Sequence, residues 1–278
     1  MPSLRSWWQS HVVETRRRVN AESRLHWNEV DPSRPDRRTF AVVLTGLACL
    51  FLLRTFGSTY RLGPWSDLLK AVGLPNAAEA FIDWLRHGEN AKFNGRVFWS
   101  LTRLAVYLAI PVLVVKVFLR ARLRDFGWAL PRTRDWTLYG VLAALLAPVV
   151  ILASYQPGFM RKYPFYPVGA DEPLWPGFWS WEAMYAGQFV ALEFFFRGFL
   201  IHGTKHRFGF GAIYFSVVPY MMVHYGKPPA EVLGSVVAGL VLGTLSLGSG
   251  SVWGGAALHA VVAVAMDCLV LAHRLGRF

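Results

Sequence analysis

The stretch Val252-Trp-Gly-Gly-Ala-Ala-Leu-His-Ala-Val-Val-Ala-Val-Ala-Met-Asp-Cys-Leu-Val-Leu-Ala272 decides the fold class of this protein. At a rise of 1.5 Å per residue, its roughly 21 residues match a hydrocarbon core about 30 Å thick. His259 and Asp267 are its only strongly polar side chains. A run this long and this apolar is typical of a transmembrane helix.

Six further apolar runs of similar character lie along the chain. They are Phe40 to Phe56, Phe98 to Leu119, Leu138 to Tyr155, Met184 to Ile201, Phe208 to Val223 and Val232 to Leu247. Apolar residues make up 54% of the chain and charged residues 17%, a balance that departs from soluble domains. The sequence therefore predicts an all-α, polytopic transmembrane helix bundle with about seven spans. We expect a basic N-terminal segment over 1–38 and one transmembrane domain over 39–278.

The net charge of +12 is distributed as in a membrane protein. Residues 1–38 hold eight arginines, and residues 120–134 hold five more against one acidic residue. By the positive-inside rule both segments are cytoplasmic, so we expect an integral protein of a bacterial inner membrane with a cytoplasmic N-terminus and no nucleic-acid partner. The 155–180 loop is then external. The C-terminus is external too, with Arg274 and Arg277 as a mild violation that leaves room for one incomplete crossing.

Two segments have the pattern of helices that lie on a membrane. Leu4, Trp7, Trp8 and Val12 beside the arginine cluster predict a basic interfacial helix, with a disordered arm as the alternative. Leu68 to Trp84 has a similar mixed pattern and is interpreted as a surface or re-entrant helix. The first 38 residues lack the apolar core of a signal peptide.

Ionisable side chains within predicted spans are candidate functional residues, since insertion of each costs about 2.5 to 3.5 kcal/mol. Glu193 and Arg197 are four residues apart, a spacing that places both on one helical face where they can pair. His224 ends one run and His259 lies within the last. Taken singly, each has a structural explanation, such as a helix-joining ion pair or a histidine bonded to a carbonyl. Together, one carboxylate and two imidazoles on separate helices suit the activation of water for hydrolysis.

Other residues in the spans give weaker signals. Asp267 is deep in its run, although it is equally compatible with a helix end or an ion pair. Phe194, Phe195 and Phe196 are more typical of packing or lipid contact than of a substrate site. Cys49 and Cys268 are expected to be small packing residues without a disulfide.

The stretch Leu192-Glu-Phe-Phe-Phe-Arg-Gly-Phe-Leu200 resembles the first motif, Glu-Glu-x-x-x-Arg, of the CAAX-protease and bacteriocin-processing membrane family. Two further motifs follow in order. Tyr220-Met-Met-Val-His224 is similar to Phe-x-x-x-His, and His259-Ala-Val-Val-Ala263 half matches His-x-x-x-Asn or Asp. Arg124-Asp-Phe-Gly-Trp128 is similar to the family's lead-in to its core spans. The resemblance covers roughly residues 120–270.

This resemblance implies a glutamate-type intramembrane endopeptidase that cleaves a membrane-associated or C-terminal peptide tail. Glu193 and His224 would activate a water molecule, His259 would stabilise the oxyanion, and Arg197 would orient Glu193 or keep it ionised. The expected partners are the lipid bilayer and a peptide or protein substrate. No cofactor is expected. A metal held by Glu193, His224 and His259 is an alternative, although no His-Glu-x-x-His motif supports zinc.

Two positions depart from the family pattern. Leu192 replaces the first Glu of the pair, and Ala263 replaces the Asn or Asp after the second His. One alternative is therefore an inactive relative that keeps the fold as a membrane binding or chaperoning protein. Another is a transporter in which Glu193 and the histidines relay protons; the chain shows no inverted repeat to favour it.

Overall fold

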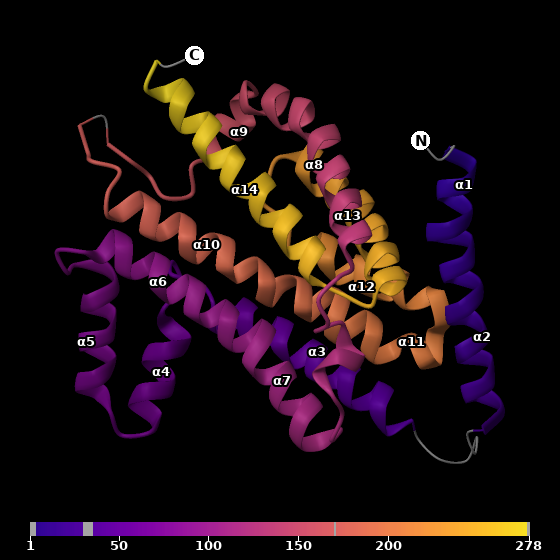
Figure 1. The fold of residues 1–278 in the computed structure, drawn as a ribbon. Coiled ribbons are helices and arrows are strands. Elements are labelled where there is room, and N and C mark those ends of the chain that lie inside the picture. The colour runs from indigo at the N-terminus through magenta and orange to yellow at the C-terminus, as the bar shows by residue number, and fades with distance from the viewer. Residues whose placement is uncertain (1–3, 30–35, 170, 277–278) are drawn as a thin grey trace.

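Helices form almost all of the regular structure in a computed structural model that describes residues 4–29, 36–169 and 171–276. The N-terminal part contains α1 (Leu4–Trp8), η1 (Gln9–Val13), α2 (Glu14–Glu29), α3 (Arg37–Phe56), α4 (Gly63–Ala71), α5 (Pro75–Arg86), α6 (Ala91–Leu104), η2 (Ala105–Ala109), α7 (Ile110–Leu113), η3 (Val114–Phe118) and η4 (Leu123–Phe126). The C-terminal part contains α8 (Thr133–Ser154), α9 (Pro157–Lys162), α10 (Gly177–Glu193), η5 (Phe194–His202), α11 (Gly203–Phe208), η6 (Gly209–Gly211), α12 (Ala212–Met222), α13 (Pro229–Ser249) and α14 (Trp253–Arg274). The predicted all-α, polytopic bundle is confirmed (Figure 1).

Six helical stretches in the described part of the chain are long and apolar enough to cross a membrane, one fewer than the seven apolar runs. They are Arg37–Phe56, Ala91–Phe118, Asp135–Ser154, Gly177–Met222, Pro229–Ser249 and Trp253–Arg274. The predicted runs Met184 to Ile201 and Phe208 to Val223 are joined in the fourth stretch, which is 46 residues long and turns at Gly209, where φ is +56°. After this turn α12 packs back along η5 and α13. Its 11 residues span only about 16 Å, too short for a full crossing on their own.

Peripheral and central helices differ in how much of each is buried. Only 17% of the α3 and α8 windows is buried inside the protein, against 78% for the Gly177–Met222 stretch. On α3, Phe40, Leu44, Leu47 and Phe51 form an exposed apolar stripe at helical spacing. Such a stripe suits lipid and is unfavourable in water, so α3 and α8 lie at the lipid-facing periphery.

The wide-turn helix η5 lies at the centre of the bundle. All nine of its residues are buried, and Phe194, Phe195, Phe196 and Phe199 are each 0% exposed. They pack with side chains from α3 and η2 in the largest apolar cluster. The three consecutive phenylalanines are therefore packing residues, as expected.

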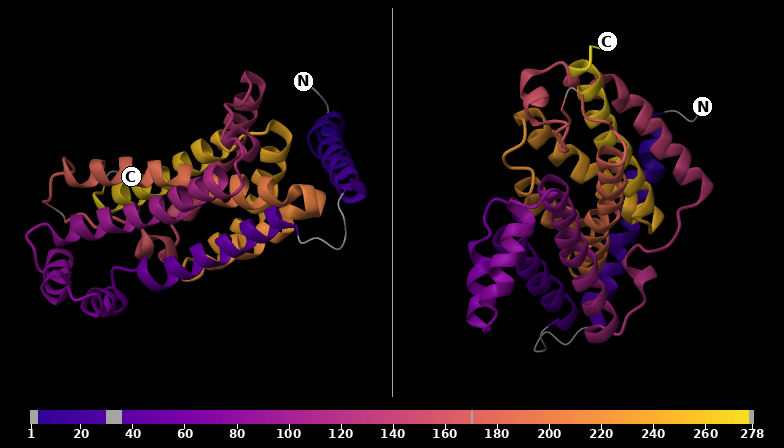
Figure 2. Two further views of the ribbon diagram at one scale, coloured as in Figure 1. Left: turned by 90° about the horizontal axis from the view of Figure 1, so that it is seen from below. Right: turned by 90° about the vertical axis from the view of Figure 1, so that its left-hand side faces the viewer.

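The N-terminal segment forms a helix, so the disordered-arm alternative is wrong for residues 4–29. Figure 2 shows this helix across one end of the bundle, with the α4–α5 hairpin toward the opposite end. Arg18 Nη2 donates to the carbonyl oxygen of Leu247 at 2.7 Å, and the Phe210 N–H donates to Asn20 Oδ1 at 2.8 Å. These bonds fix the helix on α13 and η6. Its position on a lipid surface stays a prediction.

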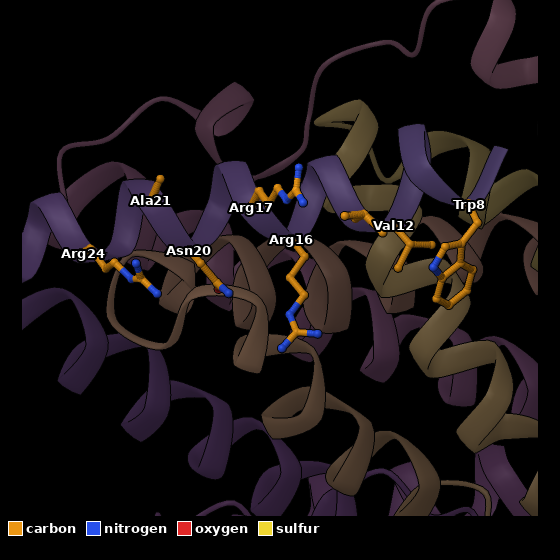
Figure 3. Close-up of a pocket in the computed structure, with 8 residues that line it drawn as sticks. Trp8, Val12, Arg16, Arg17, Asn20, Ala21 and Arg24 are labelled. Carbon is orange, nitrogen blue, oxygen red and sulfur yellow. The ribbon is translucent and has the colours of Figure 1, made fainter. Parts of the chain in front are cut away.

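A basic cavity of about 490 Å³ follows the N-terminal helix. Its lining residues are Trp8, Val12, Val13, Arg16, Arg17, Asn20, Ala21 and Arg24. In Figure 3 the side chains of Arg16 and Arg24 extend from the same side of the helix. The cavity therefore combines cationic groups with an aromatic end.

The sequence suggested a single surface or re-entrant helix over Leu68 to Trp84, but the structure has parts of two helices, α4 and α5, in this segment. It contains a turn in which Gly73 has a φ of +80°, between α4 and α5. Leu62, Leu85 and Phe98 pack at the base of this hairpin and join it to α6. The left-handed conformation at Gly73, which favours glycine, is the reason the helix divides there.

Two ends of the bundle can be distinguished by contacts. At one end the N-terminal helix contacts α11 and α13. At the other, Arg274 Nη2 donates to the carbonyl oxygens of Met160 and Tyr163. The end of α14 and the loop around α9 therefore share a face of the bundle.

Candidate active site

Glu193 and Arg197 pair inside the central helix, where α10 passes into η5. Arg197 Nε lies 3.2 Å from Glu193 Oε2, and the two side chains are 2% and 0% exposed. The sequence spacing of four therefore predicted the pairing correctly. A buried carboxylate of this kind is retained only if neighbouring groups compensate its lost hydration.

His259 from α14 contacts the same carboxylate. Its Nδ1 lies 3.1 Å from Glu193 Oε1, and its ring stacks on Phe189 with centroids 4.2 Å apart. Because an ionised carboxylate can only accept, Nδ1 is the donor, and in the neutral ring Nε2 then keeps its lone pair. The His259 side chain is 17% exposed, whereas Glu193 is fully buried. His259 is therefore the partly exposed member of a group whose other two side chains, Glu193 and Arg197, are buried.

His224 reaches the cluster through Tyr220, which lies one turn earlier in the chain. The His224 Nδ1–H donates to the Tyr220 carbonyl at 2.8 Å, an arrangement that leaves Nε2 as an acceptor. The Tyr220 ring centroid lies 4.7 Å from the His224 ring, 6.4 Å from the His259 ring and 3.9 Å from the Arg197 guanidinium carbon. Tyr220 is thus the shared neighbour of three predicted site residues.

The structure brings Arg197 and His259 into direct contact with Glu193, while His224 adjoins this group across Tyr220. Closer contact between His224 and Glu193 stays a prediction. The alternative of a metal held by Glu193, His224 and His259 gains no support: among the described residues, the three ligand-capable side chains that converge within 4.8 Å are His26, Asp36 and His206.

Close backbone packing around the site explains the glycines of the motifs. A Cβ on Gly255 would lie 2.9 Å from Glu193 Oε2, and a Cβ on Gly198 would lie 2.6 Å from the Phe126 carbonyl oxygen. The Arg124-Asp-Phe-Gly-Trp128 segment supplies that carbonyl. Gly127 also accepts from the Val252 N–H at 2.9 Å, next to the start of α14. The sequence resemblance had placed Gly198 and the Arg124 to Trp128 segment in motifs, but it did not predict these contacts.

The two residues that depart from the family pattern lie in apolar surroundings. Leu192 is 9% exposed and belongs to the central apolar cluster around η5. Ala263 is 5% exposed and belongs to a separate cluster that includes Tyr185 and Phe189. The Glu193–Arg197 and Glu193–His259 contacts form without the missing groups. Glu193 Oε2 and Arg197 Nη1 and Nη2 have no hydrogen-bond partner among the described residues.

Asp267 is buried elsewhere in the bundle and does not end a helix, because α14 continues to Arg274. It is 0% exposed, and its Oδ2 accepts from the Phe165 N–H at 3.0 Å. This bond ties α14 to the 155–176 loop. The cysteines behave as expected: Cys49 and Cys268 are free thiols.

Comparison with known families identifies the region that contains the site. Residues 173–265 match the family model described as type II CAAX prenyl endopeptidase, Rce1-like. These residues form an Rce1-like domain. No curated protein and no solved structure gives a significant match to the chain. The Rce1-like domain contains Glu193, Arg197, His224 and His259. The predicted resemblance to CAAX proteases is therefore confirmed. The lead-in segment Arg124 to Trp128 lies before the matched residues.

His224 in the Rce1-like domain should make stability depend on pH. Burial and the Lys227 ammonium lower the pKa of His224 to about 3. In the unfolded chain the pKa is near 6.5. Between these two pH values the unfolded chain therefore binds more protons than the folded protein. Stability then falls as the pH falls. We expect a loss of about 2 kcal/mol from His224 between pH 7 and pH 5. Thermal unfolding of the detergent-solubilised protein at both pH values measures it.

The control for this prediction is the exposed His87. His224→Gln should reduce the pH-dependent change in melting temperature, while His87→Gln should leave it as in the parent protein. An equal pH dependence in the parent and in His224→Gln would show that the native state does not hold His224 neutral.

Proposed function

We propose that this protein is an intramembrane endopeptidase that cleaves a membrane-associated or C-terminal peptide tail. One observation carries the proposal: a fully buried carboxylate, Glu193, contacts both a guanidinium and an imidazole, with a second imidazole beside them. Helix packing alone does not require a buried carboxylate beside a guanidinium and two imidazoles. The match to an endopeptidase family supports hydrolysis as the chemistry.

Glu193 and His224 are the proposed acceptors for the protons of the attacking water. The Glu193 oxygens retain lone pairs beside their contacts with Arg197 and His259, and His224 presents an unprotonated Nε2. Transfer of one proton from water leaves a hydroxide equivalent that attacks the substrate carbonyl. The same proton then passes to the leaving amine, so the site returns to its starting state.

The hydrogen bond to Glu193 restricts how His259 can act on the oxyanion. Nδ1 is already engaged, so His259 can donate to an oxyanion only through a protonated Nε2. Arg197 contacts the Glu193 carboxylate and the Tyr220 ring, so we assign it the role of a positioning residue.

Comparison of protein C-termini in cells with and without this gene tests the proposal and identifies the substrate. We expect at least one membrane-associated protein to keep an uncleaved tail in the deletion strain, and a prenylated peptide, a peptide precursor or a sorting tail would each define the substrate class. Purified protein in liposomes should cleave that tail. Binding of the tail without cleavage would instead identify an inactive relative, and solute movement without cleavage would identify a transporter.

The proposed topology has a cytoplasmic N-terminus and an external 155–176 loop. A Gly169→Cys variant should react with an impermeant maleimide in intact cells, because residue 169 is exposed and a Cβ there makes only ordinary contacts with Glu172. Arg122→Cys, which is proposed to be cytoplasmic, should react only after lysis. The reverse pattern of labelling would show that the chain is inserted the other way round.

A further inference from the structure

Two histidines and one aspartate converge where the N-terminal helix meets the bundle. His26 lies in α2, Asp36 precedes α3 as its N-cap, and His206 lies in α11. Each offers one ligand atom, and these atoms all lie within 4.8 Å of one another. Figure 1 shows α2 beside α11, in agreement with the contacts between the two helices. The cluster is separate from Glu193, His224 and His259.

The spacing within this cluster is close to that of ligands around one metal ion. His206 Nε2 lies 3.3 Å from Asp36 Oδ1 and 3.2 Å from Asp36 Oδ2. Two ligand atoms bound to zinc at about 2.0 to 2.1 Å and at a tetrahedral angle lie about 3.4 Å apart. Since all the ligand atoms lie within 4.8 Å of one another, a shift of at most roughly 1.5 Å brings any pair of them to that separation.

An unpartnered nitrogen at this position indicates a missing partner. His26 Nε2 is buried and has no hydrogen-bond partner among the described residues. The two imidazole rings stand edge to face, with centroids 4.7 Å apart. An uncompensated buried polar atom is unfavourable, and a coordinated cation would satisfy this nitrogen.

Asp36 is held in place by contacts that leave it free to bind a cation. The Thr39 N–H donates to Oδ1 at 3.0 Å, and Thr39 Oγ1 donates to Oδ2 at 2.7 Å. Each carboxylate oxygen accepts more than one contact, so the N-cap bond and a metal bond are compatible. Such supporting hydrogen bonds orient carboxylate ligands in metal sites.

We propose that His26, Asp36 and His206 bind a divalent transition-metal ion, for which Zn²⁺ is the probe. Two imidazoles and one carboxylate suit zinc with one remaining position for water. Because the ligands come from three separate elements, the bound ion fastens the N-terminal helix to α3 and α11. The inference does not depend on the proposed peptidase activity.

Zinc binding by the full-length protein in detergent tests this site. After treatment with a chelator and addition of Zn²⁺, elemental analysis should find one strongly bound zinc per chain, and Zn²⁺ should raise the melting temperature. His26→Gln and Asp36→Asn should each weaken zinc binding by at least about 100-fold, because each removes one of three ligands. Asp36→Asn retains a good N-cap residue, so α3 should still form.

Two control variants make the result specific. His87 Nδ1 and Asp83 Oδ1 lie 3.2 Å apart in an exposed pair without a third ligand, so His87→Gln should bind zinc like the parent protein. His259→Gln should also keep the ion, because it alters only the candidate active site. The proposal is overturned if the parent protein binds no zinc, if zinc persists in His26→Gln and Asp36→Asn, or if His259→Gln alone abolishes binding.

Discussion

Replacing Glu193 by Gln should lower peptide cleavage by about two to four powers of ten, the usual contribution of a positioned general base. Gln has nearly the same size, and its amide oxygen can still accept from His259 Nδ1. It cannot take a proton from water at neutral pH. The measurement is the initial rate of tail cleavage in liposomes, with the substrate found by comparison of C-termini.

Glu182 provides a matched control for this substitution. It is another buried carboxyl side chain of α10, 3% exposed, and lies outside the proposed catalytic group. Glu182→Gln should therefore retain most of the cleavage rate in folded protein. Full activity in Glu193→Gln would make Glu193 a structural residue and would require another base.

Leu192→Glu separates loss of activity from divergence of the motif. Leu192 packs in the apolar cluster around η5, so a carboxylate there would be buried without a partner and should destabilise the protein. We expect no gain in cleavage from this variant. A variant that cleaves only after Leu192→Glu would show instead that the natural protein is an inactive relative.

The fold was predictable wherever local hydrophobicity determines it. All seven apolar runs are helical, and the Glu193–Arg197 pair follows directly from helical spacing. The span count was less accurate, because α12, which follows the turn at Gly209, has only 11 residues, and the length of the apolar run did not reveal how short this helix is. The α4–α5 hairpin was missed for the same reason, since it depends on the conformation of Gly73.

The site was predictable only in part, because its contacts join distant segments. His259 and Glu193 are 66 residues apart, and only the order of the family motifs and the rarity of ionisable side chains in the predicted spans linked them. Tyr220 was visible as a motif residue, but its position between Arg197, His224 and His259 depends on packing. Gly255 gave no chemical signal, and its close approach to Glu193 appears only in three dimensions.

Replacing Arg197 by Ala should destabilise the protein by about 3 to 5 kcal/mol, the usual cost of removing one partner from a buried ion pair. Arg197 is 1% exposed, and its loss leaves the Glu193 carboxylate with the His259 N–H as its remaining partner. The cation–π contact with Tyr220 is lost as well. The measurements are expression yield and the melting temperature in detergent, and cleavage should fall with both.

A double-mutant comparison distinguishes this electrostatic cause from simple loss of packing. If the uncompensated Glu193 charge causes the damage, Arg197→Ala should cost less stability in the E193Q background than in the parent protein, because a neutral amide is cheaper to bury. If lost packing of the long side chain is the cause, the cost should be equal in both backgrounds. Equal costs would mean that Arg197 supports the helix without holding Glu193 ionised, and its positioning role in the proposed peptidase would be wrong.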